Sequence, residues 1–272
     1  MAGSSSATAG TMTRTQRPSA LSAFFSNLSI QRLGLILVLI LLWQIYGQFF
    51  ANHALLAPPS DVAVALVTKI FGDPKVVSAL GYGVAEIVIA YVMAVVGGMA
   101  IGIAVGFTDF GRKSFLPVIM LLYFVPQVVL LPLLMLVFGI GPAAKIAFGF
   151  SHGIFPVIFN TVVGMRQVPE LFVRSAKSTG ASRAQIVRHV IFPNMVPQVF
   201  AGLRLSMTVT LLGVLLAELF VSTGGIGYYA QTFGQTYDPA PLFALITTLA
   251  CLAIGMNELV RIIERRFTRW KN

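Results

Sequence analysis

The chain has 272 residues, of which 57% are hydrophobic and only 10% are charged, and its mean hydropathy is +0.85. A soluble domain usually carries about 25% charged residues, so this composition excludes an ordinary water-soluble protein and indicates a lipid solvent. The net charge of +10 predicts no nucleic-acid partner here, because Lys and Arg gather in the cytoplasmic loops of membrane proteins.

Residues 1–30 are rich in Ser, Thr, Ala and Gly, which predicts a disordered cytoplasmic tail before a transmembrane domain at 31–272. The apolar runs that follow predict an all-α polytopic membrane protein with six transmembrane helices, at 33–50, 82–107, 115–138, 143–165, 197–221 and 241–263. The first run starts late and lacks a small-residue cleavage site, so we interpret it as an uncleaved span.

Two segments between the spans have patterns of their own. An amphipathic stretch at 62–71 predicts a short surface helix between the first two spans. The segment 222–240 is rich in Gly and aromatic residues, and we interpret it as a loop that could re-enter the membrane.

Small residues and prolines mark the second and third spans. Ala94, Gly98, Gly102 and Gly106 recur every four residues, so they share one helix face that another backbone can approach closely. Pro126 and Pro132 interrupt the third span, and each favours a kink because it removes a backbone hydrogen bond.

The distribution of charge predicts the orientation. With the N-terminus inside, the segments 1–32, 108–114, 166–196 and 264–272 hold most of the 19 Lys and Arg residues, whereas Lys69 and Lys75 lie outside and Lys145 begins the fourth span. The positive-inside rule therefore places both termini in the cytoplasm.

The segment 166–196 is the longest polar stretch after the tail, and it predicts two capped helices. Pro169 and Glu170 are typical of a helix start, and Gly180 is typical of a left-handed helix end. Ser182 and Gln185 match a capping box for a second helix, which Pro193 either ends or tilts into the next span. We therefore expect a rigid helix–turn–helix at the membrane surface, suited to a groove in another protein.

This segment resembles the EAA loop of binding-protein-dependent ABC importer permeases, whose pattern is Glu-Ala-Ala, three residues, Gly, nine residues, Ile, one residue, Leu-Pro. Here the triplet is Arg174-Ser175-Ala176, so Arg replaces the Glu and Ser the first Ala. The later positions of the pattern are taken by Gly180, followed by Ala181 and Ser182, and by Val190, Phe192 and Pro193. LLAPPSDVAVAL, VPQVVLLPLLMLVFGIG and GGIGYY are similar to segments of the nitrate, sulfonate and taurine permeases.

The resemblance implies a type I ABC importer permease and a set of partners. In this family the loop docks into an ATPase subunit, of which there are two, and a substrate-binding protein delivers the solute from outside. The sequence has no Gly-x-x-x-x-Gly-Lys-Ser/Thr phosphate loop, so we expect no enzyme activity and no directly bound cofactor, with ATP used by the partner. One set of spans makes half a pathway, which implies a second copy of the chain and a homodimer. The implied cargo is a nitrate-, sulfonate- or taurine-like anion.

Polar residues inside spans are candidates for the transport pathway, because they are costly in lipid. Glu86 and Glu218 fall near the outer ends of the second and fifth spans, where each could orient substrate, bind the delivery protein or pair with Lys145. His152 and Asn160 lie on the fourth span, and Asn160 is more typical of a bond to a neighbouring helix. Arg204 lies about two turns into the fifth span, where it could snorkel inward or pair with a carboxylate.

Two other classes compete with the importer. A secondary transporter driven by an ion gradient would use buried carboxylates near mid-membrane, but Glu86 and Glu218 fall too near the outer face. A membrane enzyme would need convergent nucleophiles or metal ligands. The single Cys251 and three widely spaced histidines do not indicate a metal site.

Overall fold

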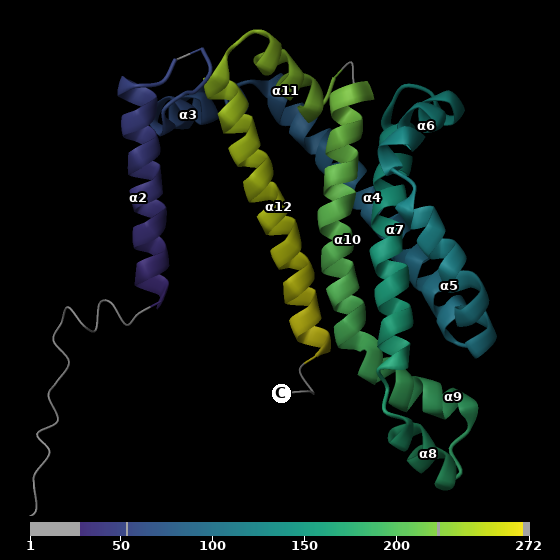
Figure 1. Ribbon diagram of the computed structural model, residues 1–272. Helices are drawn as coiled ribbons and strands as arrows, with labels where there is room; N and C mark the ends of the chain where they lie inside the picture. Colours follow the sequence, from purple (N-terminus) through teal and green to yellow (C-terminus); the bar gives the residue numbers. More distant parts are fainter. Residues whose placement is uncertain (1–27, 53, 222–223, 269–272) are drawn as a thin grey trace, which may run out of the picture.

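The computed structural model describes residues 28–52, 54–221 and 224–268, and these ranges are helical without a strand (Figure 1). The long helices are α2 (Leu28–Phe49), α4 (Pro74–Gly106), α5 (Asp109–Phe124), α7 (Pro142–Arg166), α10 (Phe192–Val221) and α12 (Pro239–Phe267). The short α-helices are α3 (Pro59–Ala65), α6 (Leu130–Phe138), α8 (Glu170–Ser178), α9 (Arg183–Ile186) and α11 (Ile226–Gln235). The π-helices η1 (Leu66–Ile70) and η3 (Val187–Ile191) and the 3-10 turn η2 (Gln127–Val129) complete the set. The predicted all-α class is confirmed.

The predicted tail at 1–30 lies outside the described residues, apart from residues 28–30. These three residues are already part of α2, so the first helix begins earlier than its apolar run.

The centre of the molecule is α7, which packs against α4 on one side and α10 on the other, with α12 beside α10. In Figure 1 the helix α2 stands away from this bundle and is joined to it through α3. Helices α8 and α9 and the last turn of α12 lie at one end, which we name the loop end. Helices α3, α6 and α11 lie at the opposite end, which we name the far end.

Five helices are long and apolar enough to span a membrane, namely 30–49, 74–106, 142–166, 183–220 and 239–267. A sixth span exists if α5 and the segment η2–α6 are counted as one bent span, because together they pass the same test. The six predicted spans thus correspond to five continuous helices and one broken pair.

The break in the third span occurs at Pro126, where the helix direction changes by 74°. Val125 has an extended backbone with ψ of 127°, which is the conformation that a residue before proline favours. The break predicted at Pro126 is confirmed. Pro132 does not interrupt a helix, because it lies in the first turn of α6, where backbone N–H groups have no intrahelical acceptor.

The predicted small-residue face of α4 packs against α7. A Cβ atom added to Gly98 would lie 2.7 Å from Cβ of Val157, and one added to Gly102 would lie 2.7 Å from Cβ of Thr161. Neither position has room for a larger residue, so the two backbones approach as closely as the sequence pattern predicts.

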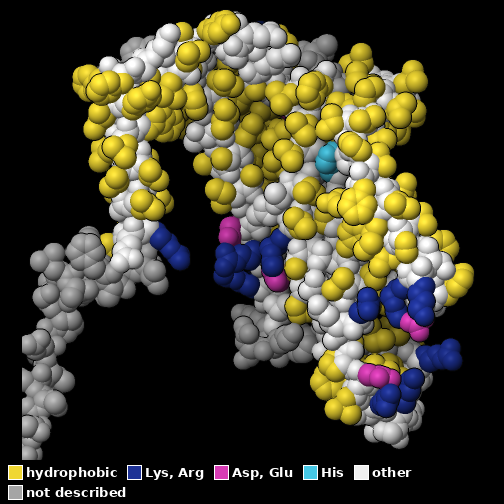
Figure 2. All heavy atoms as spheres, viewed as in Figure 1, with side chains coloured by type: hydrophobic (Ala, Val, Ile, Leu, Met, Phe, Trp, Pro, Cys, Tyr) yellow, Lys and Arg dark blue, Asp and Glu magenta, His cyan; other side chains and the backbone are white. Residues whose placement is uncertain are grey.

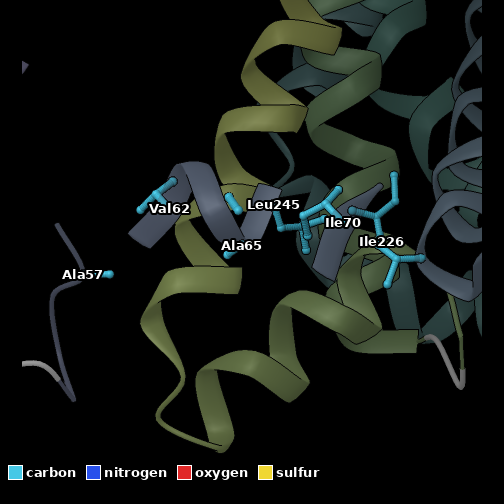
Figure 3. Packing of buried hydrophobic residues seen from close by; sticks show 8 residues of the cluster. Ala57, Val62, Ala65, Ile70, Ile226 and Leu245 are labelled. Atoms are coloured by element: carbon cyan, nitrogen blue, oxygen red, sulfur yellow. The ribbon is translucent and has the colours of Figure 1, made fainter. Parts of the chain in front are cut away.

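At the far end an apolar cluster joins α3, η1, α11 and α12 (Figure 3). Its members Val62, Ile70, Ile226 and Leu245 are buried, and the predicted surface helix at 62–71 is confirmed as α3 and η1. The interpretation of 222–240 as a loop is wrong for most of its length, because α11 fills residues 226–235. Its apolar residues Ile226, Tyr229, Ala230 and Phe233 recur at helical spacing and pack on this cluster.

The surface of the spans is largely apolar. Along α2 nearly every side chain is exposed, and large apolar side chains are also exposed on α5 and α6. On the face drawn in Figure 2, Lys and Arg side chains gather at the loop end below this apolar band. Lipid or a second protein chain would have to cover so much apolar surface.

Candidate functional site

The helix α8 ends at Gly180 in a Schellman motif. Gly180 has φ of +80°, its N–H donates to the carbonyl of Lys177 at 3.0 Å, and the N–H of Ala181 donates to the carbonyl of Ala176 at 3.0 Å. These bonds satisfy two carbonyls that a helix end otherwise leaves free. The left-handed end predicted at Gly180 is confirmed.

A capping box starts the next helix. The hydroxyl of Ser182 accepts the Gln185 N–H at 3.3 Å, and Oε1 of Gln185 accepts the Ser182 N–H at 2.8 Å. The elbow between α8 and α9 is therefore fixed by hydrogen bonds on both sides of Gly180. A hollow of about 360 Å³ lies at this elbow, lined by Ala176, Gly180, Ala181 and Val190 among others.

The second helix of the loop continues into the fifth span without a break. Residues 183–220 form one helix of 38 residues, made of α9, η3 and α10. Pro193 does not end this helix, because the π-helix η3 ends two residues before it and a widened turn can accommodate a proline; instead the fifth span is tilted against α9 (Figure 1). We name these 38 residues the rod; Phe192, at the start of α10, is exposed on it.

The triplet at the start of the motif is on the exposed surface of α8. Arg174 forms an ion pair of 2.9 Å with Glu170, one turn earlier, and both side chains are more than 70% exposed. The family motif has a Glu where this chain has Arg174. In this chain a carboxylate is present one turn earlier, at Glu170. Ser175 is exposed and Ala176 is half-buried beside the hollow.

At the far end three buried charged side chains meet. Nζ of Lys145 on α7 lies 2.7 Å from Oε1 of Glu86 on α4 and 3.4 Å from Oε1 of Glu218 on α10. Oε2 of Glu218 accepts the N–H of Gly227 at 3.1 Å, which ties α11 to the same group. We name Glu86, Lys145 and Glu218 the ionic cluster. The pairing with Lys145, one of the options left open for each carboxylate, is confirmed.

A cavity of about 490 Å³ opens beside the ionic cluster. Its walls come from the first turns of α4, the residues before and at the start of α7, and the start of α11. Glu86 and Lys145 lie on its wall, together with Lys75, Tyr82 and Tyr228. Another hollow, lined by Arg112, Lys177 and Arg183 among others, lies at the loop end.

The remaining candidate residues bond within the bundle. Oδ1 of Asn160 accepts from Nε2 of Gln198 on α10 at 2.7 Å, which is the bond to a neighbouring helix expected for it. Arg204 pairs with Glu264 on α12, so the carboxylate option is the one that the structure shows. His152 contacts the carbonyl of Phe148 through Nδ1 at 3.0 Å. None of these three lines the far-end cavity.

Residues 94–269 match the family described as binding-protein-dependent transport system inner membrane component. The matched region begins on the small-residue face of α4 and contains the loop, the rod and two of the three members of the ionic cluster. The chain belongs to this family.

Three named relatives align with most of the chain. It is 31% identical over 243 residues to the taurine transport system permease protein TauC of Escherichia coli, with 88% of each chain covered. It is 28% identical to the putative aliphatic sulfonates transport permease protein SsuC of Bacillus subtilis, over 88% of this chain and 87% of the relative. It is 26% identical to the nitrate import permease protein NrtB of Synechococcus elongatus, over 84% of this chain and 86% of the relative. The sequence resemblance to this permease group is confirmed.

The fold of the permease is also found in solved structures. Two inward-facing conformations of the MetNI methionine ABC transporter superpose with TM-scores of 0.62 and 0.59 at 17% and 18% identity. The matches cover 71% and 73% of this chain, and 95% and 96% of those chains. They confirm the expected importer-permease fold, and with the family they make the chain a multi-pass inner membrane protein.

Sequence reasoning missed several partners in this permease. It did not find Gly227 as a donor to Glu218, Gln198 as a partner of Asn160, or Glu264 as a partner of Arg204. The signal for Glu264 is present, because Glu264 and Arg204 are opposite charges near the same ends of two spans. Among the described residues no group of three His, Cys, Asp or Glu side chains could hold a metal ion.

Proposed function

We propose that this chain is the translocation subunit of an ATP-driven importer, in which the α8–α9 loop docks into a partner ATPase. The observation that carries the proposal is the capped elbow at Gly180, joined directly to the rod. The loop projects beyond the ends of the spans, and it presents a hollow between two rigid helices (Figure 1). A side chain of a partner can enter such a hollow without reordering the loop, which keeps the entropic cost of binding low.

ATP chemistry belongs to the partner in this proposal. The sequence contains no phosphate loop, so the permease binds no nucleotide or other cofactor directly, and two ATPase subunits supply hydrolysis. The permease contributes the pathway and the mechanical connection.

The gathering of Lys and Arg at the loop end supports the orientation of the chain (Figure 2). Because cytoplasmic loops carry an excess of Lys and Arg, the loop end lies in the cytoplasm with both termini, and the far end faces outward. An ATPase and a delivery protein would then meet opposite ends of the molecule.

A second copy of the chain completes the pathway. Five or six spans make half of the helices that a two-subunit channel needs, and the exposed apolar surfaces of α2, α5 and α6 leave ample area for packing. We propose a homodimer in the bilayer, which receives its solute from an extracytoplasmic binding protein. The names of the relatives favour a taurine-, sulfonate- or nitrate-like cargo.

The pathway candidates are Glu218, His152, Asn160 and Arg204. Glu218 has the strongest support, because its cluster borders the far-end cavity and because it lies on the same rod as the loop. Uptake by Glu218→Gln tests this role, and wild-type uptake together with normal assembly would remove Glu218 from the pathway.

Gly180→Asp tests the docking proposal. The change places a charged side chain at φ of +80° on the proposed docking surface, where no atom lies within 4 Å of the added Cβ. We expect folded permease that no longer co-purifies with its ATPase and no longer supports uptake.

Gly139→Asp is the matched control. Gly139 has φ of +76° and equally open surroundings, but it lies between α6 and α7 at the far end. The two variants carry the same added charge at a positive φ, and the strain at Gly139 is the larger, because its ψ of 176° belongs to a region essentially restricted to glycine. If Gly180→Asp retained the ATPase as well as Gly139→Asp does, the docking proposal would be wrong.

A further inference from the structure

The ionic cluster contains one more negative than positive group. A single ammonium, that of Lys145, faces the carboxylates of Glu86 and Glu218, and all three side chains are no more than 7% exposed. The described residues bring no other Lys or Arg within salt-bridge distance of either carboxylate. Buried charges are stable only when they are paired and hydrogen-bonded, so one carboxylate lacks compensation.

The hydrogen bonds identify Glu86 as that carboxylate. Both oxygens of Glu218 are acceptors, one for Lys145 and the other for the N–H of Gly227. Glu86 uses only Oε1, whereas its Oε2 is buried and has no hydrogen-bond partner within the described part of the chain. An unpartnered buried carboxylate oxygen is costly, and it calls for a donor.

Glu86 also lines the far-end cavity, from which a donor can approach its carboxylate. Residues 75, 78, 79, 82 and 86 lie on one face of α4 and form one wall, so the cavity extends about 16 Å along the helix from Lys75 to Glu86. Glu86 lies at the end next to the ionic cluster, and Lys75 lies in the first turn of the helix. A small solute with its ammonium group at Glu86 does not reach Lys75 over this distance, and it leaves its anionic group inside the cavity.

We propose that the cavity binds a small solute through a primary ammonium group, which donates to Oε2 of Glu86. This inference rests on the proposed function and narrows it, because it selects aminated solutes from the taurine-, sulfonate- and nitrate-like set. An ammonium group neutralises the excess charge of the cluster and supplies the missing donor in one contact. An inorganic anion does neither at this position.

The test measures binding to the permease–ATPase complex in nanodiscs, without binding protein and without ATP. The probes are taurine and isethionate, which carries a hydroxyl in place of the amine. We expect taurine to bind at least about tenfold more tightly, as a charge-assisted bond to a buried carboxylate implies. Propylamine, which has the ammonium but no sulfonate, should compete with taurine.

Glu86→Gln should abolish the preference for taurine, because it removes the charge and keeps the shape. Asp73→Asn is the matched control: it removes one carboxylate at the same end of α4, outside the cavity, and Asn still caps the helix. Equal binding of taurine and isethionate to the wild type would overturn the inference, as would a preference that survives Glu86→Gln.

The result of this binding test can be distinguished from a failure of the importer proposal. The binding measurement needs neither transport nor hydrolysis, so a complex that binds taurine at Glu86 and fails to transport it would contradict the importer proposal alone. A complex that transports solute without the amine preference would contradict only the present inference.

Discussion

Lys145 lies between the two carboxylates of the ionic cluster, and its side chain is only 7% exposed. Removing one partner of a buried ionic group is far more damaging than replacing the whole group, because the remaining charges lose their compensation. The stability of the far end should therefore depend on Lys145 more than on either carboxylate.

Lys145→Met keeps most of the side-chain volume and removes the charge. We expect a loss of about 3–5 kcal/mol of folding stability, measured as reduced thermal stability of the purified protein in nanodiscs. Lys69→Met removes an exposed charge on η1 at the same end, and it should change stability by less than about 0.5 kcal/mol. The triple variant Lys145→Met, Glu86→Gln, Glu218→Gln should recover most of the loss. Equal stability of the two single variants would show that the cluster does not hold the far end together.

At the scale of elements, the packing of α4 on α7 rests on single glycine positions. Gly97 and Gly98 are neighbours on α4, but only Gly98 faces α7 closely. A Cβ at Gly98 would lie 2.7 Å from Val157 and 2.9 Å from the carbonyl of Ile154, whereas a Cβ at Gly97 has its first contact at 3.5 Å.

Gly98→Ala should destabilise the bundle by about 1–3 kcal/mol, because it overfills the interface. Gly97→Ala should be neutral or stabilise by up to about 1 kcal/mol, because alanine is the better helix former. Comparing the thermal stability of the two variants checks the register of α4 against α7. A larger loss for Gly97→Ala would mean that α4 is rotated, so that Gly97 rather than Gly98 makes the close contact with α7.

The sequence predicted elements whose signals are local. The elbow at Gly180 and the capping box at Ser182 and Gln185 were found because both depend on residues within three or four positions of each other. The break at Pro126 was found for the same reason, since a proline acts on the residue before it. The spans were found from continuous apolar runs.

Other elements depend on contacts between distant residues, and the sequence did not reveal them. α11 was interpreted as a loop because it contains Gly227 and Gly234, and its helix is stabilised by packing of Ile226 and Phe233 on α3, η1 and α12. In the same way, the sequence offered Lys145 as one partner among several for Glu86 and Glu218. Only the packing of α4, α7 and α10 brings the three together.

At the scale of the whole molecule, the rod connects the two candidate sites. It begins at Arg183, next to the elbow, and Glu218 of the ionic cluster lies near its other end. Its α10 part has 30 residues and is about 45 Å long, enough to span the bilayer, and α9 lies at a steep angle to it at the loop end (Figure 1). We expect that an ATPase that displaces the elbow also moves Glu218. This movement would change the ion pair of Glu218 with Lys145 and its hydrogen bond with Gly227.

The importer proposal requires that an ATPase subunit covers the elbow. The direct measurement is photo-crosslinking in native membranes, with a photoreactive residue at Ala181 in the elbow and, in a second variant, at Ile140 at the far end. We predict that Ala181 crosslinks to an ATPase subunit with a yield that changes when ATP is added, and that Ile140 does not. Crosslinks to the ATPase from Ile140 and none from Ala181 would contradict the account.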